Sequence, residues 1–180
     1  MAEFVADSPT AEVLGNVVLS ILDGMGSLRS RAVQILAQNG IHDLDPNRWY
    51  PQQGVLSAFR TIFEKVGPST LQMIGHKIPT NAQFPPSIHT ITEALRSIEV
   101  AYRMNHRGLG PTVAYKYEPV SERSARMVCE NPYPCEMDLG LVEGMAERFR
   151  PKDSLRIQVT HAPGDCRRRQ AERCTYTVHW

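Results

Sequence analysis

Four cysteines in the last third of the chain are the residues whose types and spacing could do chemistry. Cys129 and Cys135 bracket a short turn that contains two prolines, and Cys166 and Cys174 bracket an arginine-rich insert. The thiolate is the form of cysteine that attacks electrophiles and binds metals. In a reducing compartment, clustered cysteines are more often metal ligands or reactive groups than disulfides. The pattern therefore predicts that two turn regions meet in a metal site or a redox site.

Composition limits the classes of protein to which the chain could belong. Its 180 residues, 42% of them hydrophobic, suffice for one sizeable core, so we predict a single domain over residues 1–180. A net charge of +1 gives no overall field that would recruit nucleic acid or an anionic membrane. The amino terminus lacks the basic and apolar regions of a signal peptide, and no apolar run reaches the roughly 20 residues of a membrane span. We expect a soluble cytoplasmic protein.

The first part of the chain, residues 1–110, is predicted to be mainly helical. Apolar residues recur there at spacings of three and four. Thr10 is the expected N-cap of the first helix, and Ser87 is expected to open the last one. The predicted helices cover residues 10–39 with a break at 24–26, residues 51–66, residues 71–78 with Pro79 as the end, and residues 87–105.

The second part, residues 111–180, is predicted to be strand-strand-helix-strand-strand. Alternating residues indicate strands over 112–117 and 124–128, joined through Pro119, and over 154–160 and 174–180. A helix over 134–149 lies between these pairs, and its Gly140 and Gly144 would allow a backbone to approach closely. The basic turn after Cys166 is expected to be solvated, and Asp138 is expected to serve the helix dipole. This order of elements predicts an α+β domain with an antiparallel sheet.

These features resemble the 4-vinyl reductase domain family. The matching pieces are the segment from Pro134 to Phe149, the strand after it, and Cys166 with Cys174 before the final strand. The family shares its fold with haem nitric-oxide-binding domains and with subunits of the TRAPP tethering complex. The likeness covers residues 112–180, and the helical part matches in layout only. It implies an α+β fold in which a helical N-terminal layer packs on a small antiparallel sheet.

The resemblance also implies a zinc site. Metal-binding members use a cysteine at the start of that helix, a pair of cysteines separated by seven residues, and an acidic residue. Carried over, the cysteines are Cys135, Cys166 and Cys174, but the acidic position falls on Pro163, which cannot bind metal. The fourth ligand is then Cys129, His161 or Asp165, and the sulfur and nitrogen preference of zinc favours the first two. Packed cysteines that bind no metal are the alternative.

The haem-binding members of the superfamily provide a further comparison. They carry a Tyr-x-Ser-x-Arg motif and a proximal histidine. Here Ser121 and Arg123 fit part of the motif, but Tyr117 lies four residues before Ser121 rather than two. His106 and His89 are the conceivable axial ligands, although surface or capping roles are the more common fate of such histidines. Haem is therefore an alternative that we do not favour.

Taken together, we predict a non-enzymatic sensor or carrier of a small hydrophobic ligand, with a cysteine-rich zinc site. No catalytic triad, Walker loop or dinucleotide-binding fingerprint is present. Output would pass through a protein partner or a homodimer formed by the N-terminal helices. The alternatives are a TRAPP-like assembly adaptor, which an exposed apolar stripe on residues 13–36 would favour, and a haem-based gas sensor or tetrapyrrole-related reductase. The predicted pocket lining is Phe59, Phe63, Ile91, Leu95, Ile98, Tyr102 and Val142.

Overall fold

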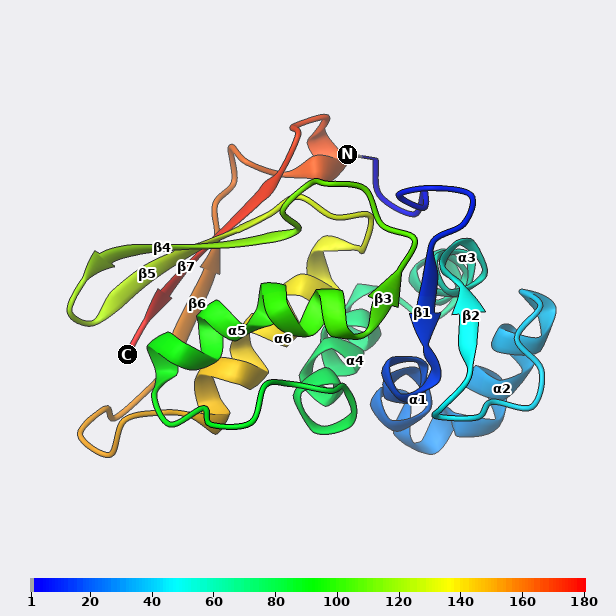
Figure 1. Cartoon of the computed structure of the whole chain (residues 1–180), viewed down its shortest axis with the longest axis horizontal. Helices are drawn as coiled ribbons and strands as arrows, with labels where there is room; N and C mark the ends of the chain where they lie inside the picture. The colour runs from blue at the N-terminus through cyan, green and yellow to red at the C-terminus, as the bar shows by residue number, and fades with distance from the viewer. Residues whose placement is uncertain (1) are drawn as a thin grey trace.

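Six α-helices and two antiparallel sheets make up the computed structural model, which describes residues 2–180 (Figure 1). This confirms the predicted α+β class. The helices are α1 (Gly15–Gly24), α2 (Arg29–Gln38), α3 (Gln52–Lys65), α4 (Pro68–Asn81), α5 (Ile91–Met104) and α6 (Cys135–Arg148). The strands are β1 (Glu12–Leu14), β2 (Trp49–Pro51), β3 (His106–Arg107), β4 (Tyr115–Ser121), β5 (Ser124–Cys129), β6 (Gln158–His161) and β7 (Cys174–His179). Short 3-10 turns, η1 (Gly26–Leu28) and η2 (Arg167–Arg169), complete the list.

The larger sheet has the strand order β4-β5-β7-β6, with every neighbouring pair antiparallel. Helices α5 and α6 cover one of its faces (Figure 1). The predicted hairpin is confirmed, but its turn was predicted wrongly, because Pro119 lies within β4 and the turn falls at 122–123. The strand predicted over 154–160 begins only at Gln158. Leu155 is 97% exposed, so the apolar alternation that indicated a longer strand does not correspond to burial.

A second sheet, with the order β2-β1-β3, was not predicted. Its middle strand β1 occupies the start of the segment predicted as a helix from Thr10, so that N-cap was wrong. Val13 pairs with Tyr50 on one side and with His106 on the other. Strands this short have no visible period of two, and β1 forms because two distant segments supply its hydrogen-bond partners.

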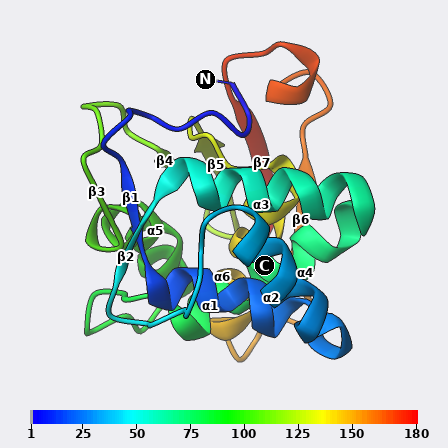
Figure 2. The same cartoon turned by 90° about the vertical axis from the view of Figure 1, so that its right-hand side faces the viewer.

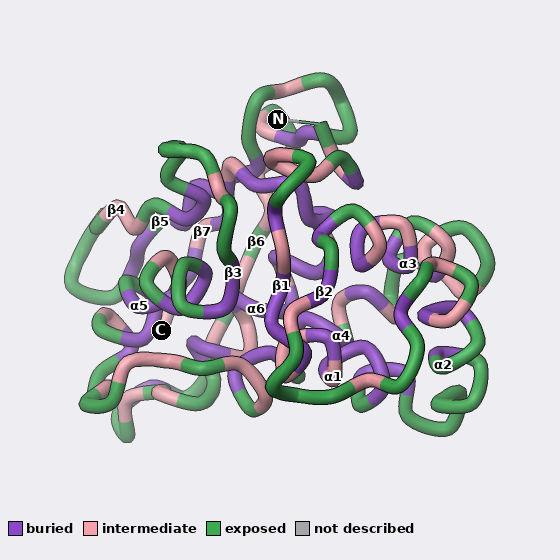
Figure 3. Tube along the Cα trace, turned by 45° about the vertical axis from the view of Figure 1, so that its right-hand side comes forward, coloured by how far each residue is buried: buried purple, intermediate pink, exposed green. Residues whose placement is uncertain are grey.

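Three helices cross at very short distances in the middle of the molecule, and glycines make this packing geometrically feasible. A Cβ on Gly75 of α4 would lie 2.2 Å from the carbonyl oxygen of Met137 in α6. A Cβ on Gly140 of α6 would lie 2.0 Å from the carbonyl oxygen of Gln72 in α4. The prediction that Gly140 permits close backbone approach is thus confirmed. Figure 2 shows α1, α4 and α6 stacked behind one another, and Figure 3 shows buried segments on each of these helices.

Two helix ends differ from the predictions. Helix α4 continues two residues beyond Pro79. Proline lacks a backbone N–H, so one hydrogen bond is lost, and the last turn of the helix tolerates this loss. Helix α5 begins at Ile91 rather than at Ser87, whose φ of 90° lies outside the helical region. Thr90 is its N-cap and forms a capping box with Glu93.

The apolar stripe on residues 13–36 is mostly inside the core. Its buried members are Val13, Leu14, Val18, Ile21, Leu22, Ala32, Ile35 and Leu36. Leu28 and Val33 are exposed, at 43% and 51%, and Val17 and Leu19 are partly buried. The exposed stripe expected of an assembly adaptor is therefore not found on this segment. Among the described residues, no helix combines the length and the apolar character that crossing a bilayer requires.

Candidate metal centre and apolar cavity

Three cysteines and one histidine meet near the end of the larger sheet. One ligand atom from each of Cys135, His161, Cys166 and Cys174 lies within 4.8 Å of every other. The Cys135 sulfur is 3.0 Å from that of Cys174 and 3.7 Å from that of Cys166. Sulfur ligands of a tetrahedral zinc, each at about 2.3 Å from the ion, are about 3.8 Å apart. The Cys135–Cys166 separation matches this value, the Cys135–Cys174 separation is shorter, and all four atoms are close enough together to share one ion.

Each candidate ligand lies at or next to the end of a regular element. Cys135 is the first residue of α6, Cys174 is the first residue of β7, and Cys166 directly precedes η2. His161 ends β6, where it pairs with Tyr176 of β7, and the two rings are stacked with centroids 4.7 Å apart. His161 Nε2 also lies 3.2 Å from the carbonyl oxygen of Asp165, the type of contact that orients a ligand histidine.

The electrostatics of the group favour a thiolate at Cys174. The hydrogen bond between the two sulfurs lowers the pKa of Cys174 and raises that of Cys135. Hydrogen bonding by His161 and the positive charge of Arg167 also lower the pKa of Cys174. The same contact with Cys174 raises the pKa of His161. A thiolate at Cys174 is the form that a metal ion binds.

The other two candidates for the fourth ligand lie outside this group. Cys129 is fully buried on β5, where it pairs across the sheet with Cys174, and burial raises the pKa of its thiol. Asp165 uses its carboxylate to accept a hydrogen bond from Thr175 at 2.9 Å. Of the three alternatives left open by the sequence, the structure brings only His161 to the three cysteines.

The amino-terminal segment adds an acidic side chain that sequence reasoning missed. A carboxylate oxygen of Glu3 lies 2.8 Å from the Cys135 sulfur and accepts the Cys135 backbone N–H at 3.0 Å. Arg168 forms a bidentate ion pair with Glu136 at 2.6 Å and a longer one with Glu3 at 3.4 Å. In Figure 1 the blue segment that contains Glu3 lies near the orange-red turn at η2. No local sequence signal links residue 3 to residue 135.

Arg167 departs from its expected role in a solvated basic turn. Its side chain is wholly buried and forms an ion pair at 2.5 Å with Asp138, which is also wholly buried. Burial raises the pKa of Asp138 to about 6, although the neighbouring Arg167 and the hydrogen bond from Tyr115 favour the carboxylate. Asp138 was expected to serve only the helix dipole, so a buried role for both residues corrects the sequence interpretation.

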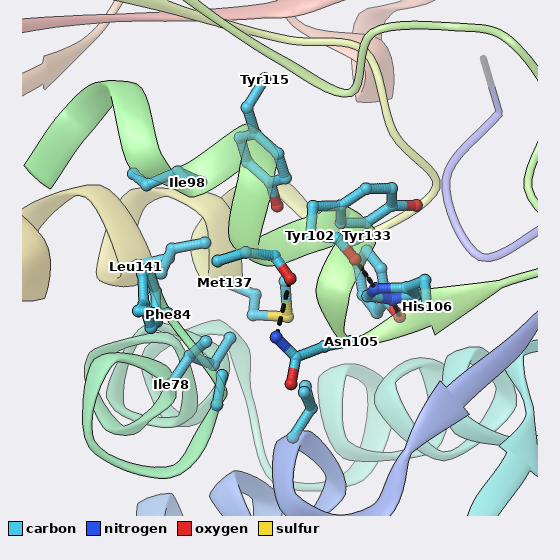
Figure 4. Close-up of a pocket in the computed structure, with 13 residues that line it drawn as sticks. Ile78, Phe84, Ile98, Tyr102, Asn105, His106, Tyr115, Tyr133, Met137 and Leu141 are labelled. Carbon is cyan, nitrogen blue, oxygen red and sulfur yellow. Dashed lines mark hydrogen bonds between the residues drawn. The ribbon is translucent and has the colours of Figure 1, made fainter. Parts of the chain in front are cut away.

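A small apolar cavity, about 40 Å³ in volume, lies among α1, α4, α5 and α6, with one wall residue from the larger sheet (Figure 4). Its walls are lined by Val17, Ile78, Ala82, Phe84, Ile98, Ala101, Tyr102, Asn105, His106, Tyr115, Tyr133, Met137 and Leu141. The polar atoms among these residues are paired with each other or with the surrounding protein. Tyr102 donates to Asp7 at 3.0 Å and Tyr115 donates to Asp138 at 2.6 Å. The surface facing the cavity is therefore apolar.

Of the residues predicted to form a pocket, Ile98 and Tyr102 line this cavity. Phe59, Ile91, Leu95 and Val142 are buried in the surrounding core but do not line it. Phe63 is partly buried and packs against the ring of Phe4. Sequence reasoning missed Tyr115 and Tyr133, which a helical spacing could not reveal because they lie on a strand and in a loop.

His106 is buried in the cavity wall in its neutral form. Burial lowers its pKa to about 4. Nδ1 lies 2.7 Å from the Tyr102 carbonyl oxygen, which can only accept, so Nδ1 carries the hydrogen. Nε2 must then accept the hydroxyl of Tyr133 at 2.6 Å. Both ring nitrogens are consequently occupied by protein groups.

These features bear on the haem alternative. Pockets for drug-sized ligands occupy roughly 300–1,000 Å³, and a haem is no smaller than such ligands, whereas this cavity measures about 40 Å³. The nitrogen of His106 that could bind iron accepts a hydrogen bond instead. His89 is exposed, and Arg123 forms an ion pair with Asp153 at the tip of the hairpin. The residues around the cavity do not fit a haem.

Comparisons with known proteins support the fold. No protein-family model matches the sequence, and neither does any curated protein. Among solved structures, an H-NOX protein from S. oneidensis in the Fe(II)NO state is similar with a TM-score of 0.65 and 12% identity, over 92% of this chain and 98% of that one. A mutant of T. tengcongensis H-NOX is similar with a TM-score of 0.61 and 16% identity, over 91% of this chain and 94% of that one. The unliganded Fe(II) H-NOX protein from K. algicida is similar with a TM-score of 0.62 and 14% identity, over 92% of this chain and 95% of that one. This chain therefore has the fold of H-NOX proteins.

Proposed function

We propose that this protein is a zinc-stabilised, non-enzymatic sensor or carrier domain for a small apolar ligand. Zinc would be held by Cys135, Cys166, Cys174 and His161, and the ligand would occupy the apolar cavity. The observation that carries the proposal is that one helix serves both sites. Helix α6 begins with Cys135 in the ligand group, and its next turns contribute Met137 and Leu141 to the cavity wall.

The donor set supports zinc among the metals that proteins bind. Three thiols and an imidazole are soft to borderline ligands, which suit zinc better than magnesium or calcium. Four protein ligands leave no open position for a substrate or water, which is typical of structural rather than catalytic zinc. Bound zinc would tie the start of α6 to β6, β7 and the turn at η2.

The cavity limits the size of the ligand. At about 40 Å³ it is much smaller than the engineered cavities of roughly 150 Å³ that bind benzene. Larger ligands would need the wall to move. The wall offers apolar contacts but few free polar groups, so the ligand class is a compact apolar molecule. Xenon is a suitable probe because it is spherical, uncharged and binds dry apolar cavities.

Three alternatives have less support. An assembly adaptor of the TRAPP type would need an exposed apolar face, and the stripe on residues 13–36 is mostly buried. A haem-based gas sensor would agree with the fold of the similar H-NOX structures, but the small cavity and the occupied nitrogens of His106 argue against it. A tetrapyrrole-related reductase has no candidate catalytic residue.

The test of the metal centre is elemental analysis of protein purified without added metal, with visible absorption recorded on the same sample. We expect close to one zinc per chain and no Soret band. Cys166→Ser and Cys174→Ser should each abolish stoichiometric zinc. Cys129→Ser is the matched control, since this cysteine is equally buried but lies outside the ligand group, and it should retain zinc.

Cobalt substitution adds a test of geometry. A tetrahedral site with three thiolates should give visible d–d bands and sulfur-to-cobalt charge transfer, and His161→Asn should alter the bands while leaving the charge transfer. Iron with a Soret band would refute the proposal in favour of haem. Zinc that survives Cys166→Ser and Cys174→Ser would show that the metal lies elsewhere.

A further inference from the structure

Arg167 links the cysteine group to the interior of the protein. Among the described residues, it is the only one that donates two hydrogen bonds to a sulfur of this group. Its backbone N–H and its Nε–H each donate to the sulfur of Cys174 at 3.4 Å. Such contacts orient a metal ligand and tune its basicity. Arg167 therefore responds directly to the position of the Cys174 sulfur.

The other end of the Arg167 side chain reaches into helix α6. One terminal nitrogen donates to Asp138 at 2.5 Å, and the other donates to the side-chain oxygen of Asn131 at 2.9 Å and to the Asn131 carbonyl. Both charged side chains are 0% exposed. Burying an ion pair carries a desolvation cost that Coulomb attraction often only offsets, so such a pair is weak evidence of added stability. Its geometry is nevertheless tightly constrained by the surrounding donors and acceptors.

Asp138 connects this pair to the cavity. Its second carboxylate oxygen accepts the hydroxyl of Tyr115 at 2.6 Å, and the Tyr115 ring lines the cavity (Figure 4). Tyr115 in turn packs edge-on against Tyr102, another wall residue, with centroids 5.6 Å apart. An unbroken series of contacts thus runs from the Cys174 sulfur through Arg167, Asp138 and Tyr115 to the cavity.

We infer that Arg167, Asp138 and Tyr115 couple the occupancy of the cysteine group to the binding of ligand in the cavity. The inference rests on the proposed function, because it takes the cysteine group to bind zinc and the cavity to bind ligand. Zinc fixes the Cys174 sulfur and so fixes the donors of Arg167. This holds the Asp138 carboxylate and the Tyr115 ring in the arrangement that shapes the cavity.

Reciprocity follows from linkage. If zinc raises the affinity of the cavity for a ligand, the ligand must raise the affinity for zinc by the same factor. Coupling between sites in proteins typically amounts to roughly 5-fold to 150-fold in affinity. We expect the low end, about 5-fold, because within this series of side chains only the Tyr115 hydroxyl joins the buried ion pair to the cavity wall.

The experiment measures xenon affinity from the shifts of methyl resonances of cavity residues, in zinc-loaded and zinc-free protein. Wild type should bind xenon about 5-fold more tightly with zinc bound. Tyr115→Phe retains the ring but removes the hydrogen bond to Asp138. Zinc should still bind to this variant, but the ratio of xenon affinities with and without zinc should fall close to one. Tyr133→Phe is the matched control, because its hydroxyl bonds His106 instead of Asp138, and it should keep the coupling.

A second measurement requires only zinc-loaded protein and remains informative if the zinc-free form unfolds. Release of zinc to a chelator should slow under xenon pressure in wild type and in Tyr133→Phe, but not in Tyr115→Phe. Zinc and xenon binding without mutual influence would overturn the inference and leave the proposed function standing. Full coupling in Tyr115→Phe would also overturn it. A chain that binds no zinc, or a cavity that binds no xenon, would overturn the proposed function and this inference together.

Discussion

Acidification should destabilise this protein through His106, and the effect can be worked out from its burial. The unfolded chain has a histidine pKa of 6.5, and burial lowers the pKa in the folded protein to about 4. His106 is therefore neutral in the folded protein at pH 5, whereas the unfolded chain has bound a proton. Because the unfolded state binds more protons, stability falls as the pH is lowered from about 6.5 towards 4.

The magnitude follows from the separation of the two pKa values. Each unit is worth about 1.4 kcal/mol, so the full effect below pH 4 is about 3 kcal/mol. At pH 5 the folded residue is still mostly neutral, and the expected loss relative to pH 7 is about 2 kcal/mol. His106→Gln removes the titrating group, so this part of the pH dependence should disappear. The lost hydrogen bonds lower the stability of the variant at both pH values and cancel in the comparison.

The assay is urea unfolding followed by far-UV circular dichroism at pH 7 and pH 5. A chelator and a reductant are present, so that acid release of zinc does not contribute. Between the two pH values, wild type should lose about 2 kcal/mol more unfolding free energy than His106→Gln. Equal losses in the two proteins would refute the argument that His106 is held neutral by burial.

His76→Gln is a control of opposite sign. Its hydrogen bond to Glu143, at 3.0 Å, raises the pKa of His76 in the folded protein. That stabilisation is fully present below pH 6.5 and is lost as the pH rises through the raised pKa. Removal of His76 should therefore cost more stability at pH 5 than at pH 8. A uniform cost at both pH values would contradict the assigned role of the His76 contact.

Three further changes test packing, capping and ligand orientation. Gly140→Ala adds a methyl group 2.0 Å from a carbonyl oxygen of α4 and should lower the free energy of unfolding in urea by roughly 3 kcal/mol or more. Gly144→Ala on the same helix is the control, because its nearest atoms are 3.3 Å away, and it should cost far less stability. Thr90→Ala removes the side-chain cap of α5 and should cost about 1 kcal/mol in the same assay. Arg167→Lys loses the Nε–H donor to the Cys174 sulfur and should weaken zinc binding by about 10-fold or more in chelator competition. Arg169→Lys, at an exposed position, should leave zinc binding unchanged. Equal effects of the two changes would argue against the proposal that Arg167 orients the Cys174 sulfur.

Local patterns predicted much of the helical architecture and most of the larger sheet. Helix α3 and the amphipathic α5 follow from apolar spacing, and the break near Gly24 and the stop at Gly40 follow from glycine chemistry. These signals work because side chains three and four residues apart share one face of a helix. The smaller sheet could not be predicted, since its strands have two or three residues and depend on partners far away in the chain.

The candidate site divides in the same way. The spacing of the cysteines indicated metal or redox chemistry, and the family resemblance implied Cys135, Cys166 and Cys174 as candidate ligands. The choice of His161 over Cys129 and Asp165 required the pairing of β6 with β7, which turns the histidine towards the sulfurs.

Only tertiary structure decided which polar residues lie inside. Arg167 belongs to an arginine-rich turn of the kind that is usually solvated. Packing nevertheless buries its side chain against Asp138, 29 residues earlier in the chain. Burial of a charge depends on a partner that arrives through the fold, and no local period records that partner. The sequence by itself determined the residue types available for chemistry and the elements that carry them. Their assembly beside an apolar cavity arises from strand pairing and helix crossing, because both bring together groups that are distant along the chain.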